Sequence, residues 1–274
     1  MDWLTDFLSG LFYGPFYALA YAVWNWSMGI CTGIMGTTPE NFNPTAWNYV
    51  CDTLYPWATG IAVLLMNLFF IIGFCRAVSN FKENITLELC VESMIRLVVL
   101  NVLLQKGIDL ITTIFDIAAV MSTDVMRMEQ LSFFTSDADM GAHLFWWMFG
   151  MLYFLVILVC SIMIVLTLYG RYIKLYVLVV FFPFAMTPLA AGRGVDATTY
   201  AWIKTFLSNV MEIVVIALVM SIASMLISGF SSVETPVLEY FDGAAQALNS
   251  LISVVLMTSA VKGTSALLNK SFGL

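Results

Sequence analysis

Charged residues are scarce in this chain. Of its 274 residues, 11% are Asp, Glu, Lys or Arg, whereas 61% are hydrophobic. This composition leaves too little polar surface to cover a water-soluble globule of that length. The shortage of charge therefore excludes an ordinary soluble domain and predicts a protein whose solvent is the lipid bilayer.

The residue types of common catalytic and metal sites are also rare. His143 is the only histidine, and it precedes Phe145, Trp146 and Trp147, which is typical of an aromatic belt at a membrane interface. The five cysteines include no Cys-x-x-Cys pair, and no phosphate-binding loop or Ser/His/Asp set can be assembled. We therefore expect neither catalysis nor a bound cofactor or metal.

Five apolar segments predict helices that cross the membrane, because each reaches or exceeds the roughly 17 to 25 residues that a crossing needs. Four of them contain at most one charged residue, and the other contains Lys106, Asp109 and Asp116. The five segments are 53–75, 97–121, 144–170, 205–233 and 243–261.

The Lys and Arg residues gather at alternate ends of these segments. If all five cross and the N-terminus is outside, every Lys and Arg except Lys106 and Arg127 faces the cytoplasm, as does the C-terminus. If 97–121 did not cross, Arg171 and Lys174 would face outward. The distribution of basic residues therefore supports counting 97–121 as a crossing.

The first 36 residues differ from the rest. Apolar residues recur at helical spacing in 1–12, beside Asp2 and Asp6, which predicts an amphipathic helix in the outer membrane interface and argues against a cleaved signal peptide. The stretch 13–36 is uncharged and contains several glycines, so we interpret it as a tilted or re-entrant element. The whole chain, 1–274, is predicted to form a single all-α membrane domain.

A short apolar segment, 175–191, contains Pro183 and Pro188 and has basic residues on both flanks. Proline removes a backbone donor and kinks or ends a helix, so the segment predicts a re-entrant hairpin broken at proline. The alternative is one long kinked helix.

A polar stripe follows one face of the predicted helix 97–121. Its members are spaced by four, four, three and four residues, and they are Asn101, Gln105, Asp109, Thr112 and Asp116. A carboxylate at mid-membrane costs about 2.5 to 3.5 kcal/mol, so these acids need protein or water as neighbours. Two interpretations stay open: the stripe lines a hydrophilic path, or it joins packed helices. Glu212 is a candidate interior partner for Arg96 or Lys106.

The stretch 144–230 resembles the TrbL-like family of conjugation proteins. The resemblance rests on a long apolar span, Arg171 with Lys174, the run Phe-Phe-Pro-Phe-Ala-Met-Thr-Pro-Leu-Ala at 181–190, and Trp202-Ile203-Lys204 at the start of another span. Short relatives from Gram-positive mobile elements similarly begin with an amphipathic helix that contains tryptophan, as 1–12 does here. This chain lacks the extended hydrophilic C-terminal region of longer members.

The resemblance implies a non-catalytic channel or scaffold subunit of a type IV secretion machine in the bacterial cytoplasmic membrane. Such a subunit helps DNA and protein to cross, acts with other subunits that include separate ATPases, and is expected to form homo-oligomers. If single-stranded DNA passes near it, we expect contact at a basic cytoplasmic edge composed of Arg171, Lys174, Arg193 and Lys204.

A rival hypothesis comes from a different class of protein. Acids inside the membrane and broken helices are also parts of small secondary transporters and ion channels, in which Asp109, Asp116 and Glu212 would couple to protons or cations. A purely structural scaffold is a third interpretation.

Overall fold

The computed structural model describes residues 14–79, 87–127, 143–192, 197–230 and 244–273, and 96% of these residues are helical. Within those ranges no strand occurs. The predicted amphipathic helix at the N-terminus and Arg193 lie outside the described residues.

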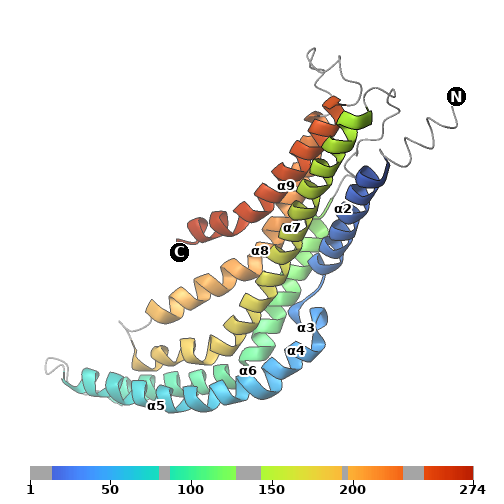
Figure 1. The fold of residues 1–274 in the computed structure, drawn as a ribbon. Coiled ribbons are helices and arrows are strands. Elements are labelled where there is room, and N and C mark those ends of the chain that lie inside the picture. The colour runs from blue at the N-terminus through green and yellow to red at the C-terminus, as the bar shows by residue number, and fades with distance from the viewer. Residues whose placement is uncertain (1–13, 80–86, 128–142, 193–196, 231–243, 274) are drawn as a thin grey trace. The chain divides into compact units, whose positions relative to one another are not determined.

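The described elements follow one another as helices of very different length (Figure 1). In chain order they are α2 (Gly14–Met35), α3 (Pro39–Phe42), α4 (Pro44–Tyr49), the π-helical segment η1 (Val50–Leu54), α5 (Tyr55–Ser79), α6 (Leu87–Val125), α7 (His143–Met186), the 3₁₀ segment η2 (Thr187–Ala191), α8 (Ala197–Phe230) and α9 (Ala244–Ser271).

Five helical stretches are long and apolar enough to cross a membrane, one for each predicted crossing. They are Pro44–Arg76, Cys90–Val125, Phe149–Ala191, Ala197–Leu226 and Ala247–Ser271. The prediction of an all-α, multi-pass membrane protein is therefore confirmed.

Several of these helices exceed the length of a crossing. α7 has 44 residues, which at 1.5 Å per residue is about 66 Å, more than twice the hydrocarbon core of roughly 30 Å. α6 has 39 residues. The uncharged segments thus predicted where helices occur, but they underestimated how far the helices continue.

The predicted hairpin at 175–191 is wrong, because α7 runs without interruption through its first twelve residues. Pro183 lies inside α7, where it removes one backbone hydrogen bond, but the bonds of the neighbouring turns keep the helix intact. The chain leaves the α-helix only at η2, in which Pro188 occupies the first turn, and η2 ends at Gly192 with a φ of 83°. The alternative hypothesis, one long helix, agrees with the structure over residues 175–186.

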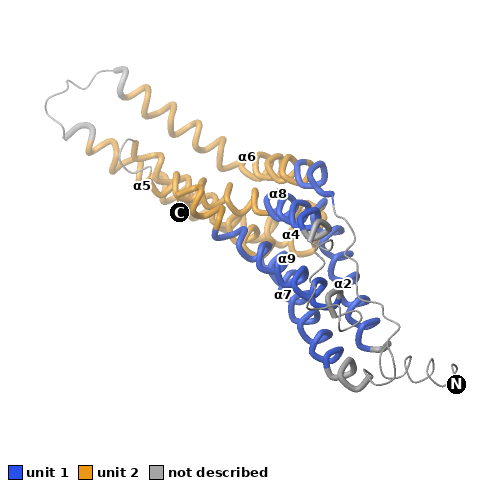
Figure 2. Tube along the Cα trace, turned by 90° about the horizontal axis from the view of Figure 1, so that it is seen from above, with its two compact units in different colours: residues 1–36, 121–170, 213–266 blue, residues 37–120, 171–212, 267–274 orange. Residues whose placement is uncertain are grey.

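The chain divides into two compact units (Figure 2). Unit 1 comprises Met1–Gly36, Met121–Gly170 and Ile213–Ala266, and unit 2 comprises Thr37–Val120, Arg171–Glu212 and Leu267–Leu274. Four helices, α6 to α9, contribute residues to both units. The prediction of a single membrane domain stays a prediction.

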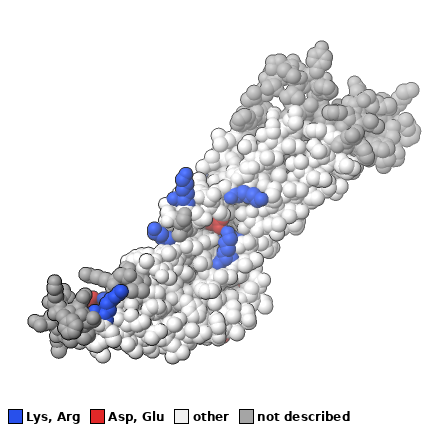
Figure 3. Space-filling view, turned by 60° about the vertical axis from the view of Figure 1, so that its left-hand side comes forward, with Lys and Arg blue, Asp and Glu red and all other residues white. Residues whose placement is uncertain are grey.

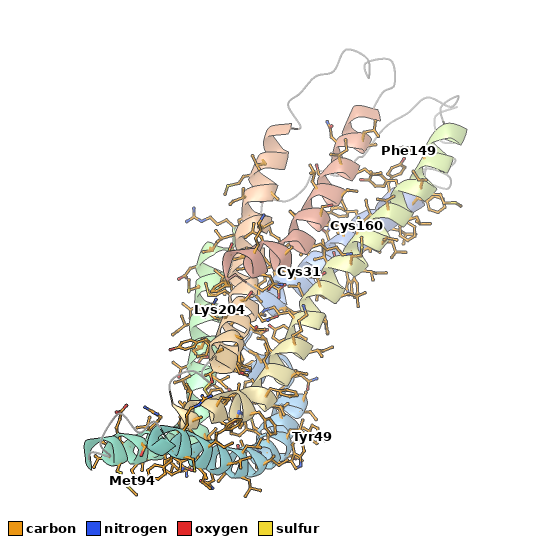
Figure 4. The ribbon with its side chains drawn as sticks, turned by 90° about the vertical axis from the view of Figure 1, so that its left-hand side faces the viewer. Cys31, Tyr49, Met94, Phe149, Cys160 and Lys204 are labelled. Atoms are coloured by element: carbon orange, nitrogen blue, oxygen red, sulfur yellow. The ribbon has the colours of Figure 1, made fainter. Side chains whose placement is uncertain are left out.

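Unit 1 packs around tyrosine and small polar residues. The rings of Tyr17 on α2 and Tyr153 on α7 lie 5.0 Å apart, and the Tyr153 hydroxyl is 2.8 Å from the Ser250 hydroxyl on α9. Cys31 on α2 and Cys160 on α7 are both buried (Figure 4). Such small or amphipathic side chains let membrane helices approach each other closely.

Unit 2 has an aromatic core. Its rings come from α4, α5, α6, α7 and α8 and contact one another in a chain composed of Tyr176, Trp47, Phe115, Phe206, Trp202, Phe182 and Tyr55. The Tyr55 hydroxyl donates a 2.8 Å hydrogen bond to the carbonyl of Leu104. Gly107 makes this approach possible, because a Cβ there would lie 2.6 Å from the Tyr55 hydroxyl oxygen.

The outer surface is mostly apolar. Large hydrophobic side chains are exposed on all the long helices, including Leu64, Met94, Leu166, Ile173 and Leu226. Among the described side chains on the face drawn in Figure 3, only a few are charged. This surface fits lipid, which is the environment that the composition predicts.

Candidate functional site

The polar stripe lies on the outward side of α6. The opposite side of the helix packs into unit 2 through Leu104, Ile111 and Phe115, all buried. Among the stripe residues, Gln105, Asp109 and Asp116 are exposed, whereas Asn101 and Thr112 are half-buried. The stripe therefore faces away from the core of its own unit.

Contacts of the stripe stay within α6. Lys106 Nζ lies 3.2 Å from Asp109 Oδ2, with side chains 74% and 70% exposed. The hydroxyls of Thr112 and Thr113 donate to the backbone carbonyl of Asp109 at 3.0 and 2.8 Å. The Asn101 amide similarly donates to a carbonyl one turn earlier, at 3.3 Å. Asn101, Asp109 and Thr112 thus make their contacts within α6, and none of the stripe residues has a hydrogen bond to another helix in the described part of the chain.

Asp116 is the charged residue of the stripe that makes no such contact. In the part of the chain that the structure describes, its carboxylate has neither a hydrogen bond nor an ion pair. Lys106 and Asp109 neutralise each other, so Asp116 is the acid whose charge is not compensated. Apolar side chains flank it on the same exposed side, including Ile117 and Val120.

Glu212 does not take the role that the sequence predicted. Arg96 pairs with Glu92 at 2.9 Å, and Lys106 pairs with Asp109. Glu212 is buried on α8, two residues after Val210, whose carbonyl accepts a hydrogen bond from Arg171. The expectation that Glu212 pairs with Arg96 or Lys106 is therefore wrong, because those cations have partners one turn away on their own helix.

Arg171 does not belong to an accessible basic edge. Its residue is 4% exposed, and it donates hydrogen bonds to backbone carbonyls of α8: Nε to Asn209 at 3.1 Å and Nη2 to Val210 at 3.2 Å. The predicted edge assumed that α7 ended here, but the helix continues and turns this side chain toward α8. Lys174 and Lys204 are exposed, and Figure 4 shows Lys204 on α8.

The burial of Arg171 was not visible in the sequence. Leu168 and Leu175, three residues before it and four after it, are fully buried on α7, but Leu166 and Ile173 on another side of the helix are also apolar and are exposed. Hydrophobic periodicity does not distinguish the sides of a helix that is apolar all round. Basic residues usually mark the end of a span, which is why the sequence predicts a cytoplasmic edge at Arg171.

A metal or disulfide site does not emerge from the described residues. Among them, no group of three or more His, Cys, Asp or Glu side chains could hold a metal ion. The five cysteines are free thiols.

Comparison with known proteins does not assign a family. No family model, curated protein or solved structure matches the chain. The exposed stripe on α6 and the buried charges of α7 and α8 are therefore the features on which a function can be argued.

Proposed function

We propose that this chain is a non-catalytic channel or scaffold subunit of a conjugative type IV secretion machine. In this proposal it lies in the bacterial cytoplasmic membrane, with the N-terminus outside and the C-terminus in the cytoplasm. The observation that carries the proposal is the exposed Asp116 on a helix long and apolar enough to cross the membrane.

Lipid is a poor neighbour for Asp116. A carboxylate at the middle of a membrane helix costs about 2.5 to 3.5 kcal/mol on insertion scales, which is the upper bound for Asp116, nine residues before the end of α6. Membrane acids are found against protein or water. The chain offers Asp116 no partner among its described residues. This cost would be removed if the exposed side of α6 contacted another subunit or a shared aqueous path.

The type of assembly is suggested by the resemblance of 144–230 to the TrbL-like family. A conjugation machine has separate ATPases as its engine, so a subunit without a catalytic constellation fits it. Formation of a homo-oligomer is supported by Gly29 and Gly33 on α2, which are exposed and have open space where a Cβ would stand. Lys174 and Lys204 are the exposed cations with which we expect single-stranded DNA to make contact.

The test is DNA transfer from a donor whose own copy of the gene is deleted and then complemented. Deletion should abolish transfer, and the wild-type copy should restore it. The variant Asp109→Asn with Asp116→Asn should insert normally, as checked by blotting, but reduce transfer by about tenfold or more, which corresponds to roughly 1.4 kcal/mol of lost interaction.

A matched control removes two other exposed carboxylates from the same helix. Glu92→Gln with Asp124→Asn changes the net charge by the same amount but leaves the stripe intact. We expect it to transfer DNA like the wild type, because exposed ion pairs such as Glu92 with Arg96 contribute little. If deletion has no effect on transfer, and the purified protein instead moves a solute or ion across liposomes, the conjugation proposal fails and the transporter hypothesis is favoured.

A further inference from the structure

Two opposite charges are buried together in unit 2. Arg171 on α7 is 4% exposed and Glu212 on α8 is 3% exposed. Both helices are long and apolar enough to cross a membrane. Charged side chains are rarely buried to this degree unless they have a partner.

The guanidinium of Arg171 lies against the backbone of α8 just before Glu212. It donates to the carbonyls of Asn209 and Val210, which are three and two residues ahead of Glu212. Inside a helix each carbonyl already accepts one backbone bond, and its second lone pair is available for the guanidinium. The arginine is thereby held within one turn of Glu212 along α8.

The two hydrogen bonds do not by themselves offset the free-energy cost of burying the charge of Arg171. Two neutral carbonyls satisfy Nε and Nη2 of Arg171 but do not neutralise a full positive charge, and Nη1 is buried with no hydrogen-bond partner among the described residues. A buried cation and a buried anion within one turn of each other lower this cost for both.

We propose that Arg171 and Glu212 form one charge pair inside the membrane-spanning part of the protein, and that this pair sets the register of α7 against α8. Arg171 is a positioning residue in this role. The proposal goes beyond the proposed function and does not depend on it, since it concerns a contact within one chain.

A double-mutant cycle tests the pair. The purified protein in detergent is heated while its tryptophan fluorescence is followed, and the Tm of Arg171→Gln, Glu212→Gln and the double variant is compared with the wild type. Each single variant should lower the Tm by roughly 10 °C, because it leaves an uncompensated buried charge. The double variant should lose far less than the sum of the two.

Conservative variants separate charge from hydrogen bonding. Arg171→Lys keeps the positive charge, whereas Arg171→Gln keeps amide donors without charge, so Lys should preserve more of the Tm than Gln. The exchange of Arg171→Glu with Glu212→Arg should be more stable than either of its single changes. Lys174→Gln, three residues further along α7 on the exposed side, is the control and should leave the Tm unchanged.

Clear results would overturn the proposal. If Glu212→Gln has no effect, if the two losses add, or if Gln replaces Arg171 as well as Lys does, the residues do not act as a pair. If the single variants fail to accumulate in the membrane, the neutral double variant should still accumulate. Equal absence of single and double variants would also refute the pair.

Discussion

Replacement of Gly73 by alanine should destabilise unit 2, although alanine is the better helix former. Gly73 lies on α5, where η2 packs closely against the helix. A Cβ at this position would lie 2.7 Å from both Cα and the carbonyl carbon of Ala191. Those atoms belong to the backbone of η2, so no side chain can rotate away to make room.

The expected size of the effect follows from the distances. An ordinary contact begins at 3.4 Å, and the Ala191 carbonyl oxygen would lie even closer to this Cβ than the two carbons do, so the two elements must separate by at least about 0.7 Å. Overpacking of this kind typically costs about 1 to 3 kcal/mol, and the helix preference of alanine offsets up to about 1 kcal/mol. The net loss of roughly 1 to 2 kcal/mol should lower the Tm by about 2 to 8 °C.

Gly60 provides a matched control on the same helix. Nothing lies within 4 Å of a Cβ at Gly60, so Gly60→Ala should leave the Tm unchanged or raise it by about 1 to 4 °C. Thermal unfolding of both purified variants in the same detergent gives the comparison. If Gly73→Ala is as stable as Gly60→Ala, the close approach of η2 to α5 is refuted.

Two further predictions concern unit 1 and the thiols. Tyr153→Phe keeps the ring against α2 but removes the hydroxyl that contacts Ser250, so the Tm should fall by the equivalent of about 1 kcal/mol. Ser250→Ala in the Tyr153→Phe background should lower the Tm little further. A double-mutant cycle measures both effects. A water-soluble maleimide should label Cys75, which is exposed, well before Cys31, which is fully buried. Mass spectrometry of the labelled native and denatured protein checks this order. Equal labelling rates of the two thiols in the native protein would contradict the burial of Cys31.

The existence of five membrane helices was predictable because it depends on local composition. An uncharged run of sufficient length predicts a crossing whatever it packs against. The ends of the helices were less predictable. The sequence predicts a boundary of a crossing at Arg171 and Lys174, yet α7 contains both in its interior, with Arg171 buried and Lys174 exposed. A positive charge marks the end of an apolar run, but not the end of a helix.

The stripe on α6 was predictable for a similar reason, since helical periodicity places residues three or four apart on one side. The pairing of Glu212 with Arg171 was not predictable, because it depends on the register between α7 and α8. That register involves contacts such as the 2.6 Å hydrogen bond from the Thr199 hydroxyl to the carbonyl of Ala185. No pattern within either helix contains this information.

The membrane charges in unit 2 differ in where their partners come from, since Arg171 and Glu212 are buried within the chain and Asp116 is exposed. This difference gives a final prediction. The chain itself supplies a partner for Arg171, so loss of Glu212 should lower the stability of the isolated protein. Asp116 is exposed and makes no contact among the described residues, so Asp116→Asn should leave the Tm of the purified chain unchanged. If Asp116 meets another subunit or water in the assembled machine, the same substitution should still lower DNA transfer. A large fall in Tm for Asp116→Asn would show instead that the acid is completed within its own chain, and the argument for an outward-facing partner of α6 would fail.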